Sequence, residues 1–368
     1  MPWDENRQVT QVVYYDTGVG ALGEYPGFAN RVLGSVDKHF GGTLGAGFEA
    51  NIEQAVTFLV NNYISGDDLF IFGFSRGAAQ ARAVTHFIDW MGGLPEQRDA
   101  YYLPRFFREY LRMKGSDSPR ESPNNSIRNF KGNLRQIDVT LLGVFDTVMS
   151  LSPRFEAKGQ TTSGSRSFHV KDRPAACVRH ARQALAIDER RFDFKPEIWV
   201  GCSNDQTLHQ RWFCGVHANI GGGYIHDGLA NLPYQWMVDE AEAYGLKIDR
   251  EFSGKYRAFA QDKLYDSRTK IYRIAEFLRR ASGKGARRLT DLPVSANLRL
   301  DKSVITRLHA NSYENSSEFK RMTHYRPENL FSLLRKNRAN LTEFIGQTGS
   351  KPRIPILPNE VLEKLGAE

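Results

Sequence analysis

The sequence predicts an α/β fold in three layers, with a mostly parallel sheet covered on both faces by helices. Short apolar runs of strand character alternate with segments whose apolar residues recur at helical spacing, and this alternation is typical of parallel sheets. The 368 residues, of which 40% are hydrophobic, also suffice for a large core. We expect an α/β core over residues 1–250 and a helical, basic extension over residues 251–368 that packs on it.

The first half of the core is predicted to run strand, helix, strand, helix. Residues 11–15 are β-branched and aromatic, which predicts a buried strand that ends in a glycine-rich turn. Residues 51–63 and 78–90 have the helical pattern, and residues 69–72 form an apolar run short enough for a buried parallel strand. We therefore expect both strands in one sheet, with the helices covering its faces.

The alternation continues after two interruptions. Stretches at about 92–136 and 150–172 are rich in polar and turn-forming residues, and we expect them to form lid insertions. The other elements are expected in this order: a strand at 138–145, a helix at about 174–185, strands at 199–200 and 210–216, and a helix at 232–244.

Composition narrows the classes of function. The sequence has no run of eighteen apolar residues that would predict a spanning helix, and its first seven residues lack the apolar core of a Sec signal. We expect a cytoplasmic protein, or one exported without a cleaved signal peptide. The three cysteines, Cys177, Cys202 and Cys214, match neither a disulfide framework nor a familiar zinc spacing. We expect no metal and no organic cofactor.

The formal charge of +8 favours an anionic partner, such as a phospholipid surface. Much of the surplus lies beyond residue 270, where a solvated basic face is an equally good interpretation. The sequence contains no helix-turn-helix, RNP-like or zinc-finger pattern, so we expect no nucleic acid partner.

The pentapeptide 73–77, Gly-Phe-Ser-Arg-Gly, has the pattern of a nucleophile elbow. Such an elbow needs a buried strand before it and a helix after it, and the flanking segments predict both. The glycines are expected because a neighbouring Cβ would clash in the strained turn. We predict Ser75 as a nucleophile and the N–H of Arg76 as an oxyanion donor. The alternative is a turn serine without chemistry.

A nucleophilic serine needs a base, and the base needs an orienting acid. Asp146 follows one predicted strand, and His217 follows another and precedes a glycine triplet at 221–223. Both follow the serine in the order acid, then histidine, and both stand at strand ends, where α/β sheets build their sites. We predict the triad Ser75, Asp146 and His217. The alternatives are one base and two acids: His226, Asp227 and Asp188.

Several short sequence motifs occur in the same order as in a known family: residues 12–20, 72–78, 143–148, 184–191, 212–217, 221–224, 236–238 and 325–330. In these motifs the chain resembles the bacterial and fungal uncharacterised α/β-hydrolase domain family, which includes phospholipase effectors of type VI secretion systems. The resemblance covers roughly residues 11–331. It implies an α/β-hydrolase-like fold and ester hydrolysis on lipids, with Ser75, Asp146 and His217 as nucleophile, acid and base. Where the family commonly has Asp two residues after the histidine, this chain has Asn219.

The expected reaction is that of a serine esterase or phospholipase with an acyl-enzyme intermediate. The oxyanion is expected to bind the N–H of Arg76 and a second donor in the turn at Thr17. Arg76, Asp16 and Tyr224 are the candidate substrate-binding residues, and a guanidinium suits a phosphate. The expected partners are a phospholipid or other ester, an anionic membrane surface, and an immunity or carrier protein.

Two other functions are open. Residues 18–23 match the dinucleotide fingerprint Gly-x-Gly-x-x-Gly, but the residues that follow predict no helix to hold a pyrophosphate. The chain could also be a non-catalytic binding module on a hydrolase scaffold, which docks a partner protein or an anionic surface. Ester turnover that depends on Ser75 separates this alternative from an enzyme.

Overall fold

The computed structural model of the chain describes residues 3–4, 9–16, 44–115, 118–149, 169–191, 194–268, 287, 289, 296–310, 325–337 and 357. By its internal contacts the chain divides into two compact units. Unit 1 comprises Met1–Ala181, Glu197–Thr207 and Ala243–Lys247, and unit 2 comprises Arg182–Pro196, Leu208–Glu242 and Ile248–Glu368. The division runs through the predicted core and not along residue 250, so the predicted extension is grouped with residues 208–242.

Among the described residues, five strands form the main sheet in the order β3-β6-β7-β8-β9. They are β3 (Leu69–Phe74), β6 (Val139–Phe145), β7 (Val178–Ala186), β8 (Thr207–Phe213) and β9 (Leu298–Leu300). In unit 1, β3 pairs with β6 in parallel, and in unit 2, β8 pairs with β9 in parallel. β7 passes from unit 1 into unit 2. This mostly parallel sheet, with helices around it, confirms the predicted α/β-hydrolase-like fold class.

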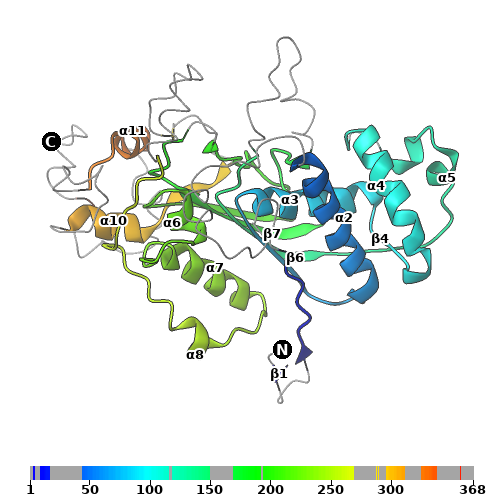
Figure 1. The fold of residues 1–368 in the computed structure, drawn as a ribbon, viewed down its shortest axis with the longest axis horizontal. Helices are drawn as coiled ribbons and strands as arrows, with labels where there is room; N and C mark the ends of the chain where they lie inside the picture. The colour runs from blue at the N-terminus through cyan, green and yellow to red at the C-terminus, as the bar shows by residue number, and fades with distance from the viewer. Residues whose placement is uncertain are drawn as a thin grey trace, which may run out of the picture. The chain divides into compact units, whose positions relative to one another are not determined.

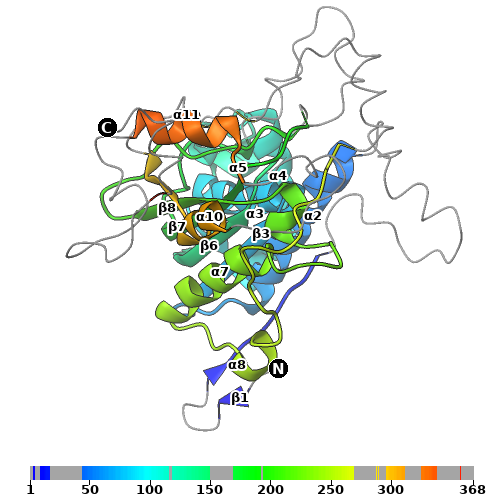
Figure 2. The same cartoon turned by 90° about the vertical axis from the view of Figure 1, so that its left-hand side faces the viewer.

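The core of unit 1 lies between β3 and three helices, α2 (Leu44–Asn62), α3 (Arg76–Met91) and α4 (Leu103–Arg112). α2 and α3 lie side by side (Figures 1 and 2). α3 is buried along almost its whole length, because small residues such as Ala79 and Ala83 allow close packing. The helices predicted at 51–63 and 78–90 are confirmed, and the first begins seven residues earlier than predicted.

The insertion at 92–136 contributes to this same core. The ring of Phe87 in α3 lies 5.0 Å from that of Phe107 and 5.1 Å from that of Tyr110, and all three side chains are buried. These aromatic side chains of the insertion therefore stabilise unit 1 by burial. The second expected insertion, 150–172, lies outside the described residues except for its last four.

The smaller elements of unit 1 are β1 (Trp3–Asp4), β2 (Val9–Thr10), β4 (Leu94–Pro95), η1 (Gln97–Tyr102), η2 (Pro119–Glu121), α5 (Asn125–Arg128) and β5 (Leu134–Arg135). β1 pairs with β2, and β4 with β5, both antiparallel.

Among the described residues of unit 2, five helices lie beside the strands: α6 (His217–Gly221), α7 (Asn231–Ala243), α8 (Arg250–Ser253), α10 (Lys302–His309) and α11 (Glu328–Lys336). α7, predicted at 232–244, is confirmed. It is fixed to β7 by an ion pair in which the buried Arg182 donates to Glu240 at 2.5 Å. Glu240 also accepts a hydrogen bond from the indole of Trp236 at 2.9 Å.

Three predicted elements are wrong. The helix at about 174–185 is the strand β7, because its alanines, arginines and single glutamine fill a central position in the sheet, where neighbouring strands outweigh helix propensity. The strand at 199–200 is irregular, with Trp199 buried. The buried strand at 11–15 is an unpaired segment whose side chains are largely exposed, held at Gln11 by two hydrogen bonds with the backbone of Lys247.

No helix among the residues described above is both long and apolar enough to span a membrane.

Candidate active site

Ser75 is the single residue between β3 and α3, and its backbone conformation is unusual. Its φ of 57° and ψ of −120° lie where residues with a side chain are rarely found. Hydrogen bonds hold this conformation on both sides. The N–H of Ser75 donates to the carbonyl of Phe145 (3.0 Å), and its carbonyl accepts from the N–H groups of Ala79 (3.2 Å) and Val148 (3.3 Å). The turn has the strand–serine–helix geometry of a nucleophile elbow.

The two glycines of the pentapeptide have different roles. A Cβ on Gly73 would lie 2.4 Å from the carbonyl oxygen of Gly77 and 2.7 Å from Cα of Ala78, and both of these are backbone atoms. A Cβ on Gly77 would meet no other atom of the described residues within 4 Å. The predicted steric need for glycine is therefore confirmed at Gly73 and wrong at Gly77.

Asp146 lies at the same edge of the sheet as Ser75. Phe74 and Phe145 are partners in the parallel register of β3 and β6, and Ser75 and Asp146 are the next residues of the two strands. Asp146 is fully buried and has a φ of 41°. Two neighbouring strand ends are therefore each followed by a non-glycine residue with positive φ. Such strain is typically concentrated at functional sites. Unit 1 thus brings together two of the three predicted triad residues.

Of the other predicted site residues of unit 1, the structure describes Arg76 and Asp16. Arg76 is the first residue of α3, so its N–H lies at the positive end of the helix dipole. Asp16 ends a described segment and is half-buried. Thr17, the expected second oxyanion donor, lies outside the described residues.

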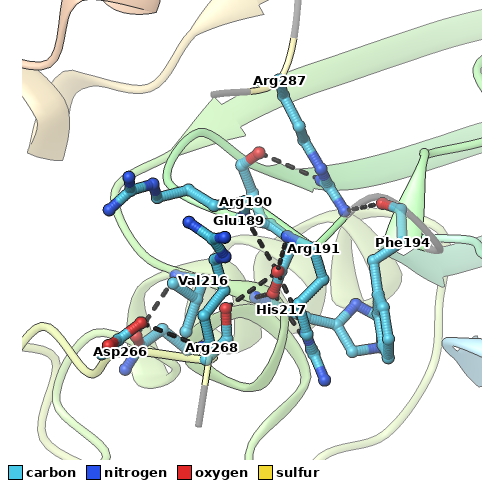
Figure 3. A network of polar contacts seen from close by, with 12 residues as sticks. Glu189, Arg190, Arg191, Phe194, Val216, His217, Asp266, Arg268 and Arg287 are labelled. Carbon is cyan, nitrogen blue, oxygen red and sulfur yellow. Dashed lines mark hydrogen bonds and ion pairs between the residues drawn. The ribbon is translucent and has the colours of Figure 1, made fainter. Parts of the chain in front are cut away.

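His217 belongs to unit 2, where it is the first residue of α6 and is buried. Its backbone N–H donates to Oε2 of Glu189 at 3.1 Å. Its ring meets the ring of Phe194 edge to face, with the centroids 4.9 Å apart (Figure 3). The guanidinium of Arg191 lies over the ring of Phe194, 3.3 Å from its centroid. The imidazole is therefore confined by packing and by its own backbone.

Glu189 is the centre of a polar network that the sequence did not reveal (Figure 3). Its fully buried carboxylate accepts hydrogen bonds from the backbone N–H groups of Arg190 (2.9 Å) and Arg191 (2.8 Å) and from the hydroxyl of Ser267 (2.8 Å). The Arg191 guanidinium donates to both carboxylate oxygens at 3.0 Å. Burial alone would raise the pKa of Glu189, but Arg191 and Arg287 outweigh it and lower the pKa to about 2.

Asp188, an alternative acid, is engaged in holding the turn before His217. Its Oδ2 accepts from the N–H of Gly215 at 2.7 Å and from the hydroxyl of Tyr325 at 2.8 Å. Burial raises the pKa of Asp188 to about 6, against the opposing effect of these two hydrogen bonds. The two adjacent carboxylates therefore have pKa values shifted in opposite directions.

Asn219, which stands where the family commonly has Asp, has a local structural role. Its buried side-chain oxygen accepts from the N–H of Val216 at 3.3 Å, in the turn that leads into α6. A carboxylate oxygen could accept the same hydrogen bond, so the departure leaves this turn intact.

The remaining candidates of unit 2 lie after α6. Tyr224 stacks on Tyr265 with the ring centroids 3.9 Å apart, and burial raises its pKa to about 12. The alternative base His226 is exposed, and its N–H donates to the Tyr265 hydroxyl at 3.4 Å. The alternative acid Asp227 is half-buried. Within the described ranges, no group of three His, Cys, Asp or Glu side chains could hold a metal ion.

A serine elbow between a parallel strand and a buried helix defines an α/β-hydrolase-like protein. The chain belongs to the T6SS phospholipase effector Tle1-like family, whose catalytic-domain model matches residues 2–240.

Individual relatives match part of the chain. It is 25% identical over 194 residues to the uncharacterized protein YEL023C of Saccharomyces cerevisiae, a match that covers 50% of this chain and 27% of the yeast protein. Two solved structures are similar at TM-scores of 0.32 and 0.27. The first is an uncharacterized protein from Pseudomonas aeruginosa, with 17% identity; the match covers 59% of this chain and 31% of that one. The second is a Tle1 effector bound to the VgrG spike, with 24% identity; the match covers 50% of this chain and 31% of that one. The chain spans less than a third of the length of each of these relatives.

Proposed function

We propose that this chain is the catalytic part of a serine phospholipase that hydrolyses carboxylic esters of glycerophospholipids. The observation that carries the proposal is the strained backbone of Ser75, held between β3 and α3 with the buried Asp146 at the adjacent strand end. Membership of a phospholipase effector family supports lipid esters as the substrate class.

In the proposed reaction, His217 takes the hydroxyl proton of Ser75 while the serine oxygen attacks the ester carbonyl. Asp146 orients the imidazole and stabilises its charged form. The N–H of Arg76, at the positive end of α3, stabilises the oxyanion, with Thr17 as the second donor. His217 then gives its proton to the departing alcohol, which leaves an acyl-enzyme. Water attacks this ester with His217 again as the base, and the fatty acid leaves.

Preference among lipids follows from charge. Arg76 stands next to the nucleophile, and a guanidinium binds a phosphate that a triglyceride lacks. The net charge of +8 attracts the chain to anionic bilayers, and salt screens that attraction.

The test is the initial rate of hydrolysis on phosphatidylglycerol vesicles, phosphatidylcholine vesicles and tributyrin, at low and high salt, for the wild type and for Ser75→Ala. The proposal predicts the fastest hydrolysis on phosphatidylglycerol, an advantage that shrinks as salt rises, and no activity above background for Ser75→Ala. A Ser75→Ala variant that keeps wild-type rates contradicts the nucleophile. A fastest rate on tributyrin contradicts the substrate class alone.

We also propose that the chain leaves the producing cell with a carrier protein, a route that membership of a secretion-effector family supports. The measurement is the amount of the chain in the medium of cells with and without a working type VI secretion apparatus. Equal amounts in both would contradict this route.

A further inference from the structure

Four large hydrophobic side chains of unit 2 are exposed close to α6 and α8 in the sequence. Ile225 is 95% exposed, Phe252 54%, Tyr256 38% and Phe259 53%. Exposure of so many large apolar side chains in two short segments is unusual, because single exposed hydrophobic residues are normally scattered over a surface. We call these four residues, three of which are aromatic, the aromatic platform.

The two segments that carry the platform are joined to each other. The N–H of Phe259 donates to the carbonyl of Gly228 at 2.9 Å, and the N–H of Gly228 donates to Oδ2 of Asp262 at 2.7 Å. The stacked rings of Tyr224 and Tyr265 form a third contact between the same segments. The exposed side chains are thus presented by a fixed backbone, so little ordering entropy is lost when something binds to them.

Within the second segment, the rings support one another. Tyr256 meets Phe252 at 5.7 Å and Tyr234 of α7 at 5.6 Å, each edge to face. Asp249 caps α8 by accepting the N–H of Phe252 at 2.8 Å. Phe252 is therefore held at the end of α8 with its ring directed outward and not folded into a core.

Two lysines contact aromatic rings of these segments. The Lys255 ammonium lies 5.4 Å from the Phe252 ring, and that of Lys263 lies 5.1 Å from the Tyr265 ring. Lys255 and Arg257 are exposed, as are two acids of this stretch, Asp249 and Glu251. Aromatic and aliphatic side chains between lysines and arginines are the combination found where proteins enter the headgroup region of an anionic bilayer.

The platform is also linked to the proposed base. α6, which begins with His217, ends at Gly221, four residues before Ile225. Ser267, two residues after Tyr265, donates to Glu189, and Glu189 accepts the N–H of His217. The segments that display the platform therefore continue directly into the residues that hold His217.

We propose that the aromatic platform, with Lys255, Arg257 and Lys263, is a docking surface for anionic phospholipid bilayers. The apolar side chains enter the interface and the cations pair with lipid phosphates. Docking brings the His217 side of unit 2 to the lipid, and this consequence rests on the proposed function, whereas the docking itself does not.

Docking is tested by co-sedimentation with vesicles of equal parts phosphatidylglycerol and phosphatidylcholine, in a Ser75→Ala background so that lipid hydrolysis plays no part. The double variant Phe252→Ser/Phe259→Ser is expected to lower the partition coefficient about tenfold or more, because each ring buries apolar surface in the interface. The matched control is Ile64→Ser/Tyr101→Ser in unit 1, whose side chains are 71% and 63% exposed and which should leave the partition coefficient unchanged.

A second pair of variants tests the charges. Lys255→Glu/Arg257→Glu should lower binding to the anionic vesicles at low salt, and the difference from the parent should shrink at high salt. The control Arg120→Glu/Lys131→Glu changes two exposed cations of unit 1 by the same charge and should have a smaller effect. Thermal unfolding midpoints within about 2 °C of the parent show that the variants fold, because surface substitutions have small effects on stability.

The proposal is overturned if the phenylalanine variant binds vesicles as the parent does, since the surface then serves a protein partner or a second copy of the chain. It is also overturned if the unit 1 controls lose as much binding. If the wild type proves to have no Ser75-dependent esterase activity while vesicle binding still depends on the platform, the proposed function fails and the docking surface stands.

Discussion

Gly73→Ala is predicted to break the elbow, whereas Gly77→Ala, four residues away in the same motif, is predicted to be tolerated. The added methyl at position 73 would lie 2.4 Å from the Gly77 carbonyl oxygen, 2.6 Å from the Gly77 carbonyl carbon and 2.7 Å from Cα of Ala78. Ordinary contacts of this kind are about 3.4–4 Å, so the start of α3 would have to move by most of an ångström. α3 is buried along its length and cannot move alone.

The magnitude follows from that rigidity. Overpacking a well-packed core costs about 1–3 kcal/mol, and clashes with three backbone atoms place Gly73→Ala at about 3 kcal/mol or more. At Gly77 the methyl meets no other atom of the described residues within 4 Å, and alanine is favoured over glycine in a helix by up to about 1 kcal/mol. The two substitutions add the same methyl group and should therefore differ by about 3–4 kcal/mol.

The assay is urea unfolding of the wild type and both variants, followed by tryptophan fluorescence and by far-ultraviolet circular dichroism. The expected result is a clear loss of stability in Gly73→Ala and an unchanged or raised midpoint in Gly77→Ala. Equal stabilities of the two variants, within about 0.5 kcal/mol, would refute the elbow geometry on which the active site is built.

Three further predictions follow. Ser75→Gly should be more stable than Ser75→Ala by about 1 kcal/mol, because glycine relieves the positive φ and both variants lack the hydroxyl; equal thermal midpoints would contradict the strain. Glu189→Gln should destabilise the chain by about 2–4 kcal/mol in urea unfolding, because the buried Arg191–Glu189 pair loses its anion, whereas the exposed Glu251→Gln should change stability by less than about 0.5 kcal/mol. Asp188 has a folded pKa of about 6 against a usual 3.8, so between these values the folded state holds a proton that the unfolded state releases; stability should fall by about 3 kcal/mol in all as the pH rises from about 3 to about 7, and Asp188→Asn, compared with the wild type, should remove this slope.

The elbow could be predicted from the sequence because its signals are local. The apolar run of β3, the Gly-x-Ser-x-Gly pattern and the alanines of α3 occur within some twenty residues. Asp146 was found by the same rule, since it directly follows an apolar strand. Strand ends of a parallel sheet meet at one edge, and the register of β3 and β6 places Asp146 next to Ser75.

Features that depend on distant parts of the chain could not be predicted in the same way. β7 has a helix-forming composition and becomes a strand through its neighbours in the sheet. The network around Glu189 joins residues that are 28 and 78 positions away from it, His217 and Ser267. The one local signal for this network was a run of two acids and two arginines, 188–191, directly after the apolar end of β7. Buried charges of this kind need compensating partners, and these come here from distant parts of the chain.

The central claim, that Ser75 is an activated nucleophile, is tested most directly by labelling the native protein with a fluorophosphonate and locating the adduct by peptide mass spectrometry. The account predicts stoichiometric labelling on Ser75 alone, none in Ser75→Ala, and labelling slowed at least about a hundredfold in His217→Ala, since loss of the general base removes a factor of this size or more. An adduct on another residue, or a folded wild type that is not labelled, would contradict the claim.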